Sequence, residues 1–414
     1  MGGYYAGLKD GFRELGLPCT WITFGPHPFG YQPDNRDHPL LWKLHGFARR
    51  GRMAVSRKDL IGKAYWICLQ QASCLLFFAW ALLRHQAFIF EASSTFFNFR
   101  ELPLLKLLGK KVVYVFHGSD ARPPYLSGHF LKMDAKDLAR WARQHKRAIR
   151  RIEAYADIVV VSPMAAHFHE RSFVPFERIG IPFRQQRRPL EQQRSSGDGK
   201  IRILHAPSNP QMKRSSLVRQ MVERLAKKGY PVELVEKSRV PNEVILEEIA
   251  QCDFVILGAY SDTAMGHLAA EAASFSKPTV VGGYTGEEIQ RVFPPEAIPP
   301  TCYCHPDNME EMTEKLIVDK EYRERMGARA KRFVETYYAP REVAGRFLRL
   351  LTASAPAEWL FDPKEVQYLF GYGLAESEVK AMVRRVLSAG GEEALQLPDK
   401  PRLRKLFVDF AHAA

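Results

Sequence analysis

The sequence predicts an α/β protein with two parallel sheets and a helical C-terminal extension. Its 414 residues exceed what one hydrophobic core usually organises. In both halves, strand-like runs alternate with helical runs, which is the pattern of parallel sheets covered by helices. The polar stretch 184–200 has no apolar periodicity and separates the halves. We therefore expect a first domain at 1–190, a second at 200–351 and an extension of unassigned role at 352–414.

The first half is expected to open with a helix over residues 7–16. Further helices are predicted at 61–83, 104–108 and 135–155, and strands at 19–24, 87–91, 111–116 and 157–162. A sheet of this kind normally opens with a buried strand, and none precedes the first helix. We therefore expect an unpaired sheet edge, as a fragment or a misassigned start codon would give.

The second half repeats the alternation from residue 201. Strands are predicted at 201–205, 232–235, 254–257 and 279–281, and helices at 215–228, 242–251, 266–275 and 308–316. Residues 320–351 are rich in Arg and Glu and are predicted to be helical. Two such domains in tandem predict a bilobal enzyme, with ligands at the carboxyl ends of the strands.

The charge balance favours anionic partners. The chain has 60 Lys and Arg against 46 Asp and Glu, a formal net charge of +14. Basic residues cluster at 41–63 and 140–151, either as a solvated face or as a patch for an anionic membrane surface. We expect no nucleic-acid partner, because no recognised module is present and the basic runs hold few aromatic residues.

Localisation follows from cysteine usage and the missing signal peptide. The six cysteines are sparse, and no basic region followed by an apolar one opens the chain. We expect a cytoplasmic protein, with peripheral attachment to the inner membrane face as an alternative. The apolar run 65–83 contains Gln70, Gln71 and Ser73, which favours a buried helix over a membrane span. The Cys302–His305 run has no second ligand pair, so we expect no metal and no cofactor.

The strongest candidate site is the segment 266–281, an Ala-rich helix followed by a strand. Gly266 marks the helix start, where free N–H groups suit a diphosphate. His267 and Glu271 are four residues apart and share one helix face. A carboxylate there can accept hydrogen bonds from ribose hydroxyls. The alternative is a packing helix whose Glu271 is solvated or ion-paired.

Two other segments contain candidate residues. In 201–216, a strand leads into a loop with Asn209 and then Lys213, whose charge would neutralise a leaving diphosphate. In 114–122, His117 lies at the carboxyl end of a strand and is followed by Gly118. A surface lysine and a structural histidine remain the alternatives.

Together these segments resemble the family 4 glycosyltransferases, which have the GT-B fold of two Rossmann-like domains facing each other across a cleft. The resemblance covers about residues 1–350. It rests on the strand before His117-Gly118, the Ala156–Ser162 run, the loop that ends at Lys213, and the Gly266, Glu271-Ala272 and Pro278 signature.

This sequence departs from the family pattern at the residues that face the donor. The first Glu of the signature is Thr263, with Asp262 beside it, and the glycine after the lysine is Arg214. The loop 206–212 lacks the basic residue that the family often has there. The missing Glu usually faces the donor sugar, so these departures bear on sugar specificity and on catalysis.

The resemblance implies a retaining, metal-independent transfer of a sugar from a UDP- or GDP-linked donor to a glycan or lipid-linked acceptor, in cell-envelope or polysaccharide biosynthesis. Lys213 and the Gly266 helix start would stabilise the diphosphate, Glu271 would hold the ribose, and His117 would contact the sugar. The remaining donor-site residues would be Gly2, Gly3, Asn209, Thr263, His267 and Leu268.

Two other activities compete with an active transferase. The departures at Thr263 and Arg214 favour a non-catalytic GT-B protein that binds or scaffolds an active enzyme. A nucleotide-sugar epimerase of the same architecture would need paired acid and base carboxylates, and the sequence offers only Glu271. Turnover of a nucleotide sugar separates the transferase from the scaffold, whereas nucleotide binding does not.

Overall fold

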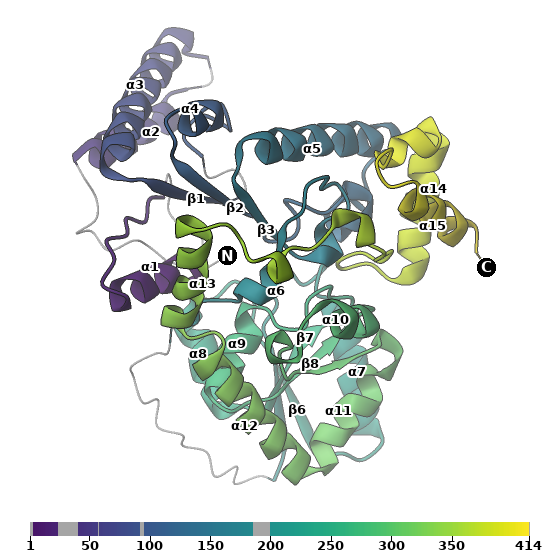
Figure 1. The fold of residues 1–414 in the computed structure, drawn as a ribbon. Helices are drawn as coiled ribbons and strands as arrows, with labels where there is room; N and C mark the ends of the chain where they lie inside the picture. Colours follow the sequence, from purple (N-terminus) through teal and green to yellow (C-terminus); the bar gives the residue numbers. More distant parts are fainter. Residues whose placement is uncertain (1–2, 24–39, 57, 92–94, 185–198, 414) are drawn as a thin grey trace.

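The computed structural model describes residues 3–23, 40–56, 58–91, 95–184 and 199–413, arranged as two lobes (Figure 1). Each lobe is built around one parallel sheet with helices packed against it. The predicted α/β class and the two-sheet organisation are therefore confirmed.

The first sheet has the order β1-β2-β3-β4 and is parallel throughout. β1 lies at its edge and is paired along its whole length with β2. The strands are β1 Ala87–Glu91, β2 Lys111–Val115, β3 Ile158–Val161 and β4 Val174–Pro175, and the helices of this lobe include α4 Leu102–Leu107, α5 Ala135–Tyr155 and α6 Phe176–Ile179. Asp134 caps α5 by accepting a hydrogen bond from the Lys136 N–H, which fixes where this helix begins.

The second sheet has the order β6-β5-β7-β8-β9 and is also parallel. Its central strand β7 is buried at every position, as expected for a sheet covered on both faces. The strands are β5 Ile201–His205, β6 Val232–Glu236, β7 Phe254–Gly258, β8 Thr279–Gly282 and β9 Cys302–Cys304, and the helices are α7 Ser215–Lys227, α8 Asn242–Gln251, α9 His267–Ser274, α10 Gly286–Val292, α11 Met309–Val318 and α12 Lys320–Thr336.

Several expectations about single elements are wrong. Residues 19–23 form no strand, because they have no hydrogen-bonded neighbour in the described sheet, and Phe24 lies outside the described residues. A helix that the sequence did not predict, α2 Leu40–Ala54, occupies part of the basic run 41–63. The short elements β4, α6, α10 and β9 were also not predicted, since runs of two to seven residues carry little periodicity.

The two lobes share a core through α1 Tyr4–Glu14 and α13 Pro340–Thr352. α13 follows the second lobe in the sequence, yet it packs against α1 and against β2 of the first sheet. One cluster of buried apolar residues joins both lobes, with Val113 and Val160 from the first sheet, Ala269 from α9 and Phe347 from α13. The lobes therefore contact each other through apolar packing as well as through polar residues.

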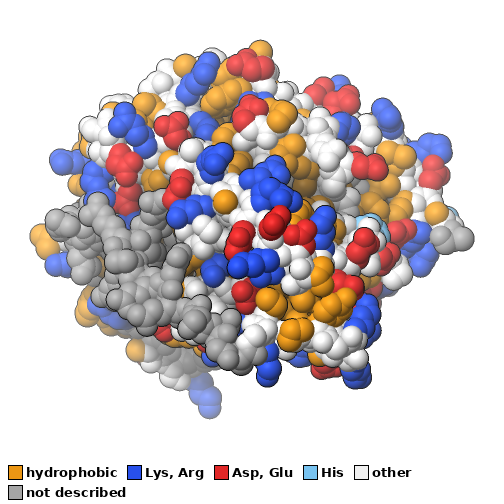
Figure 2. Space-filling model, turned by 90° about the horizontal axis from the view of Figure 1, so that it is seen from below, with side chains coloured by type: hydrophobic (Ala, Val, Ile, Leu, Met, Phe, Trp, Pro, Cys, Tyr) orange, Lys and Arg blue, Asp and Glu red, His pale blue; other side chains and the backbone are white. Residues whose placement is uncertain are grey.

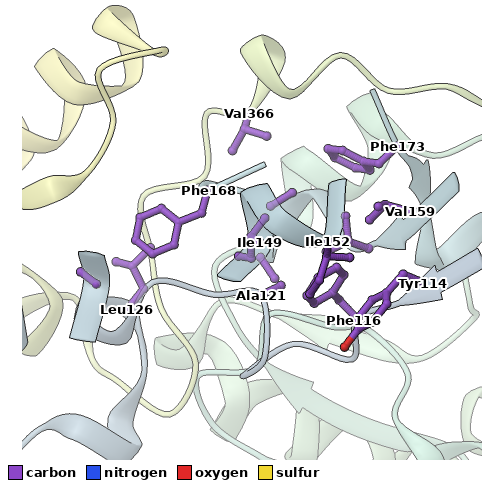
Figure 3. Packing of buried hydrophobic residues seen from close by; sticks show 14 of the residues in the cluster. Tyr114, Phe116, Ala121, Leu126, Ile149, Ile152, Val159, Phe168, Phe173 and Val366 are labelled. Carbon is purple, nitrogen blue, oxygen red and sulfur yellow. The ribbon is translucent and has the colours of Figure 1, made fainter. Parts of the chain in front are cut away.

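The C-terminal extension packs against the first lobe. Its main helices, α14 Glu376–Gly390 and α15 Pro401–His412, follow α13, and α14 packs on α5 (Figure 1). Figure 3 shows Val366 of the extension in the same apolar cluster as Phe168 and Phe173. Buried residues of the extension, such as Val366 and Phe407, are thus part of the first lobe's core.

The apolar helix α3 Leu60–Arg84 is not the buried helix that the sequence predicts. Ser73, Cys74, Phe77, Phe78 and Ala81 are buried, but most of the helix is exposed, and Ile61 and Leu83 are 86% and 89% accessible. Among the described residues, α3 is the one helix that is long and apolar enough to cross a membrane by length and composition. It pairs with α2 and presents an unusually apolar outer surface.

Candidate functional site

His117 follows β2 and meets Glu91, the last residue of the adjacent strand β1. Its Nε2 atom lies 3.0 Å from Glu91 Oε2 and 3.3 Å from the Tyr5 hydroxyl. Burial raises the pKa of Glu91, but the hydrogen bond and charge from His117 outweigh it, so that this pKa lies below its usual value. An ionised carboxylate therefore orients the imidazole at the carboxyl edge of the first sheet. Sequence reasoning missed Glu91, although it closes a strand-like run.

The start of α1 lies beside this histidine. The Tyr4 ring meets the His117 ring edge to face, with centroids 5.1 Å apart. Gly3 precedes Tyr4 and has a φ of 78°, a left-handed conformation that favours glycine. The structure thus brings Gly3 and His117 into one neighbourhood, whereas Gly2 lies outside the described residues. Contact of Gly3 with a donor stays a prediction.

The loop after His117 reaches the second lobe through Arg122. The Asp120 carboxylate accepts from the His117 and Gly118 N–H groups at 2.9 and 2.8 Å and so fixes the turn. The guanidinium of Arg122 forms an ion pair with Asp262, and the two side chains are only 4% and 7% exposed. Burial lowers the pKa of Arg122 to about 10, so it stays charged at neutral pH. At this point the two lobes are in direct contact.

Lys213 lies in the loop between β5 and α7. Its N–H donates to the Asn209 carbonyl at 3.0 Å, and the Asn209 side-chain oxygen accepts from the Gln211 and Met212 N–H groups. Asn209 thus shapes the loop, and its proposed contact with a donor stays a prediction. The loop approaches the end of β7 closely, since a Cβ on Gly258 would lie 2.6 Å from the Lys213 carbonyl oxygen.

Arg214 occupies the position where the resembled family has glycine. Its φ of 54° lies in the left-handed region, which explains why glycine suits this position. Here the arginine side chain binds the extension: its Nε and Nη2 donate to the Gly373 carbonyl at 3.1 and 2.8 Å, and Nη2 pairs with Glu378. The departure from glycine therefore has a structural role.

α9 begins directly after Gly266, as the sequence predicts. Gly266 is extended, with a φ of −95°, and a Cβ placed there would meet no atom within 4 Å. There is therefore space beside Gly266 at the start of the helix, where the first N–H groups have no partner within the helix and an anion can bind. His267 Nε2 lies 3.6 Å from Glu271 Oε1, so the predicted shared face is confirmed. Asn242 donates to the same Glu271 oxygen at 2.8 Å.

The remaining candidates of this segment are His267, Thr263 and Leu268. Burial lowers the pKa of His267 to about 4, so it is neutral at physiological pH. The Thr263 hydroxyl donates to the Met265 carbonyl at 3.4 Å, while Leu268 packs against the apolar cluster around Leu246 and Ile249. The acidic neighbour of Thr263 does not replace the missing Glu, because Asp262 is paired with Arg122.

The predicted site residues form two groups, one at the edge of each sheet. Lys213 follows β5 and Gly266 follows the loop after β7, and these strands are neighbours in the second sheet. His117 and Glu91 lie at the carboxyl ends of the neighbouring strands β2 and β1 in the first sheet. Arg122 and Asp262 link the two edges, and Tyr372 of the extension lies over both Arg122 and Lys213. Sequence reasoning singled out neither Arg122 nor Tyr372, since their partners are 140 or more residues away.

The comparisons with known proteins find similarity in structure alone. No family model matches the sequence, and no curated protein matches it. Similar solved structures include sucrose-phosphate synthase from Thermosynechococcus elongatus, with 12% identity over 73% of this chain and 81% of that chain and a TM-score of 0.43.

Two others are HepE from Anabaena in complex with UDP-glucose and the glycosyltransferase SnogD from Streptomyces nogalater. HepE is 11% identical over 68% of this chain and 82% of its own, with a TM-score of 0.39. SnogD is 13% identical over 83% of this chain and 89% of its own, with a TM-score of 0.34. Such values assign neither a family nor an activity, so the function has to follow from the residues of the site.

Proposed function

We propose that this protein is a glycosyltransferase of the GT-B type that moves a sugar from a nucleoside diphosphate donor, UDP- or GDP-linked, to a glycan or lipid-linked acceptor. The observation that carries the proposal is the edge formed by β5 and β7. These neighbouring strands bring Lys213 and the open start of α9 to one edge of the second sheet, with Glu271 one turn into the helix. Carboxyl ends of parallel strands are where such folds bind nucleotides.

The proposed chemistry is retaining and metal-independent. Lys213 and the N–H groups after Gly266 stabilise the negative charge that develops as the bond between the sugar's anomeric carbon and the phosphate oxygen breaks. Glu271 accepts hydrogen bonds from the ribose hydroxyls. His117, held by Glu91 at 3.0 Å, contacts the sugar from the first lobe. Cofactors play no part in this proposal, because the nucleotide sugar is a co-substrate.

We also propose that the protein is cytoplasmic and attaches peripherally to an anionic membrane surface. It would meet its acceptor at that surface. Helices α2 and α3 hold six Lys or Arg residues and no Asp or Glu. They also expose large apolar side chains, including Met53, Ile61 and Leu83. Apolar contact combined with basic charge is how helices bind the surface of a bilayer. A lipid-linked acceptor in cell-envelope or polysaccharide biosynthesis fits this surface.

The second lobe provides the contrast. On the face shown in Figure 2, basic and acidic side chains are mixed. In this lobe Arg219 pairs with Glu236 and Arg224 with Glu310, at 2.8 and 2.7 Å. The α2–α3 pair, whose helices contain basic residues and no Asp or Glu, therefore differs from this part of the surface.

A vesicle experiment tests the membrane part of the proposal. The double substitution Ile61→Glu and Leu83→Glu should reduce co-sedimentation with phosphatidylserine vesicles by about tenfold or more, because each large apolar side chain contributes about 1.5–3 kcal/mol when fully buried. Leu217→Glu, on the exposed face of α7, is the matched control and should bind as wild type does. Equal vesicle binding by all three proteins would reject a membrane role for this surface.

A non-catalytic scaffolding protein is the second candidate function. It is favoured by Thr263 in place of the signature Glu, and by Asp262, which is engaged with Arg122. Such a protein would bind a nucleotide without turning it over.

Turnover separates these two functions. Full-length protein is incubated with UDP- and GDP-linked hexoses, and the released nucleoside diphosphate is measured with and without glycan or lipid acceptors. The transferase proposal expects release that Lys213→Ala slows about 100-fold, as loss of one charge-stabilising group in the transition state does. Lys227→Ala, at the far end of α7, is the control. Nucleotide binding without release from any donor would favour the scaffold instead.

A further inference from the structure

A short segment of the extension, residues 371–373, is hydrogen-bonded to both lobes. The Tyr372 N–H donates to the Leu126 carbonyl, and the Gly128 N–H donates to the Tyr372 carbonyl, both at 2.9 Å, in the first lobe. The Gly373 N–H donates to the Tyr260 carbonyl of the second lobe at 2.8 Å. The segment therefore bridges the lobes where Arg122 and Asp262 also meet.

Both glycines of this segment lie so close to neighbouring backbone atoms that no side chain fits. A Cβ on Gly371 would lie 2.4 Å from the Leu126 carbonyl oxygen, and one on Gly373 would lie 2.9 Å from the Met212 carbonyl oxygen. Gly373 also has a φ of 69°, which strains other residues. The Gly-Tyr-Gly sequence thus fits one tyrosine tightly into the junction, directly beside the loop that carries Lys213.

Tyr372 lies against two cations from different lobes. The Arg122 Cζ atom lies 5.2 Å from the centroid of its ring, and the Lys213 Nζ atom lies 5.3 Å from it. Burial raises the pKa of Tyr372, but the charges of Lys213 and Arg122 and a hydrogen bond with Lys213 lower it by more. A phenol in this place is surrounded by positive charge that suits an anion better.

We propose that Arg122 and Lys213 form the diphosphate-binding pair of the donor site, and that Tyr372 is a lid which the diphosphate displaces. This inference rests on the proposed function and names the residues that bind its donor. The loop 206–212 holds no basic residue, so Lys213 needs a second cation to balance a diphosphate. Arg122 supplies it from the opposite lobe.

Arg122 retains the capacity to bind a further anion. It is paired with Asp262, but its buried Nε has no hydrogen-bond partner among the described residues. A guanidinium has five N–H donors and commonly binds phosphate through two of them. The Tyr372 ring lies against both cations, and in this proposal a diphosphate that contacts both moves the ring.

Calorimetric titration of UDP and GDP into the full-length protein tests the lid. If the lid is open in about one tenth of the molecules, removing it tightens apparent binding about tenfold. Tyr372→Ala should therefore bind UDP or GDP about tenfold more tightly than wild type. Tyr230→Ala, whose hydroxyl donates to Glu314 in the second lobe, is the control and should bind as wild type does. Unchanged or weaker binding by Tyr372→Ala overturns the lid.

The double substitution Arg122→Gln and Asp262→Asn tests the cation pair. It removes both charges together, so that neither is left buried and unpaired. We expect at least about tenfold weaker nucleotide binding, as for the loss of one charge-assisted contact. Binding equal to wild type overturns the role of Arg122. If neither wild type nor Tyr372→Ala binds UDP or GDP, the proposed function itself is rejected, and not only the lid.

Hydrogen exchange on the wild-type protein makes the test independent of these variants. In this proposal the segment 371–373 moves together with the Tyr372 ring, which breaks the hydrogen bonds of the Tyr372 and Gly373 N–H groups. Adding saturating UDP or GDP should therefore speed exchange in peptides that cover residues 368–376. Slower exchange in that peptide would show that the ligand closes the segment, and would overturn the lid.

Discussion

At the scale of single residues, Glu177 is a buried carboxyl group outside the proposed donor site. It lies in α6 directly after β4 and is 9% exposed. Burial raises its pKa to about 7, although a hydrogen bond with Ser162 acts in the opposite direction. A carboxyl group with this pKa takes up a proton on folding between about pH 4.5 and pH 7. Above that range the folded protein has to hold it ionised and buried.

We predict that Glu177→Gln raises stability in a pH-dependent way. Below about pH 4.5 the carboxyl is protonated in both states and the substitution should be neutral. As pH rises to 7, wild type loses up to about 3 kcal/mol relative to the variant, because a shift of one pKa unit corresponds to about 1.4 kcal/mol. Thermal unfolding at pH 4.5 and pH 8 measures this. A stability difference independent of pH would contradict the raised pKa.

Residue-scale reasoning from the sequence found only part of the site. His117 follows a strand, Lys213 lies in the loop after a strand, and Glu271 lies one turn into a helix, and the alternation of strands and helices in the sequence reveals these positions. Arg122 and Tyr372 gain their importance from partners that are distant in the chain, such as Asp262, 140 residues from Arg122. No local pattern in the sequence encodes such a contact.

At the scale of elements, α1 depends on glycine for its packing. A Cβ on Gly7 would lie 2.0 Å from the Pro182 carbonyl oxygen, and one on Gly11 would lie 2.0 Å from the Pro340 carbonyl oxygen at the start of α13. This close approach lets Tyr4 and Tyr5 reach His117. The helix that shapes the first lobe's candidate site is therefore fixed by two small residues.

We predict that Gly11→Ala lowers stability by about 1–3 kcal/mol, the usual cost of overpacking, although alanine favours helices. Gly46→Ala in the middle of α2 is the matched control, since its nearest neighbour would be the end of the Arg50 side chain at 3.5 Å. That change should raise stability by up to about 1 kcal/mol. Urea unfolding of both variants measures the difference. Stabilisation by Gly11→Ala would show that α1 does not pack on α13 in this way.

The bounds of elements are predicted best where the apolar pattern is clear. The bounds of α5, β5 and α8 agree with the prediction at both ends. The exposure of α3 was predicted wrongly, because an apolar run fits equally well in a core and on an outer surface. Whether such a helix is buried or exposed depends on the elements that pack against it, and the local sequence does not specify those.

At the scale of the whole molecule, the extension completes the first lobe. Twelve buried residues of the extension, Val366, Leu374, Val379, Met382, Val383, Val386, Ala394, Leu395, Leu397, Leu403, Phe407 and Ala411, belong to the first lobe's core cluster. The buried Lys146 of α5 pairs with Asp399 of the extension and with Glu170, each at 2.7 Å. Removing the extension would expose an apolar surface and leave a buried lysine with one partner fewer.

We therefore predict that a chain ending at Thr352 fails to fold as a cooperative unit. Its apolar surface should make it aggregate, or leave the first lobe poorly packed. Calorimetric unfolding of the full and shortened chains tests this, with dye binding as a second measure. A shortened chain with an unfolding temperature close to that of the full chain would contradict an integral extension.

The central claim is a donor site around Lys213 and Glu271, and titration of UDP, GDP and their common sugar conjugates into wild type and Glu271→Ala tests it most directly. Glu243→Ala, an exposed acid on α8, serves as the control. We predict that one nucleotide binds wild type and Glu243→Ala equally, and that Glu271→Ala loses about 1.5–3 kcal/mol, the value of hydrogen bonds to a charged group. Nucleotide binding that Glu271→Ala leaves unchanged, or no binding to the folded full-length protein, would contradict the claim.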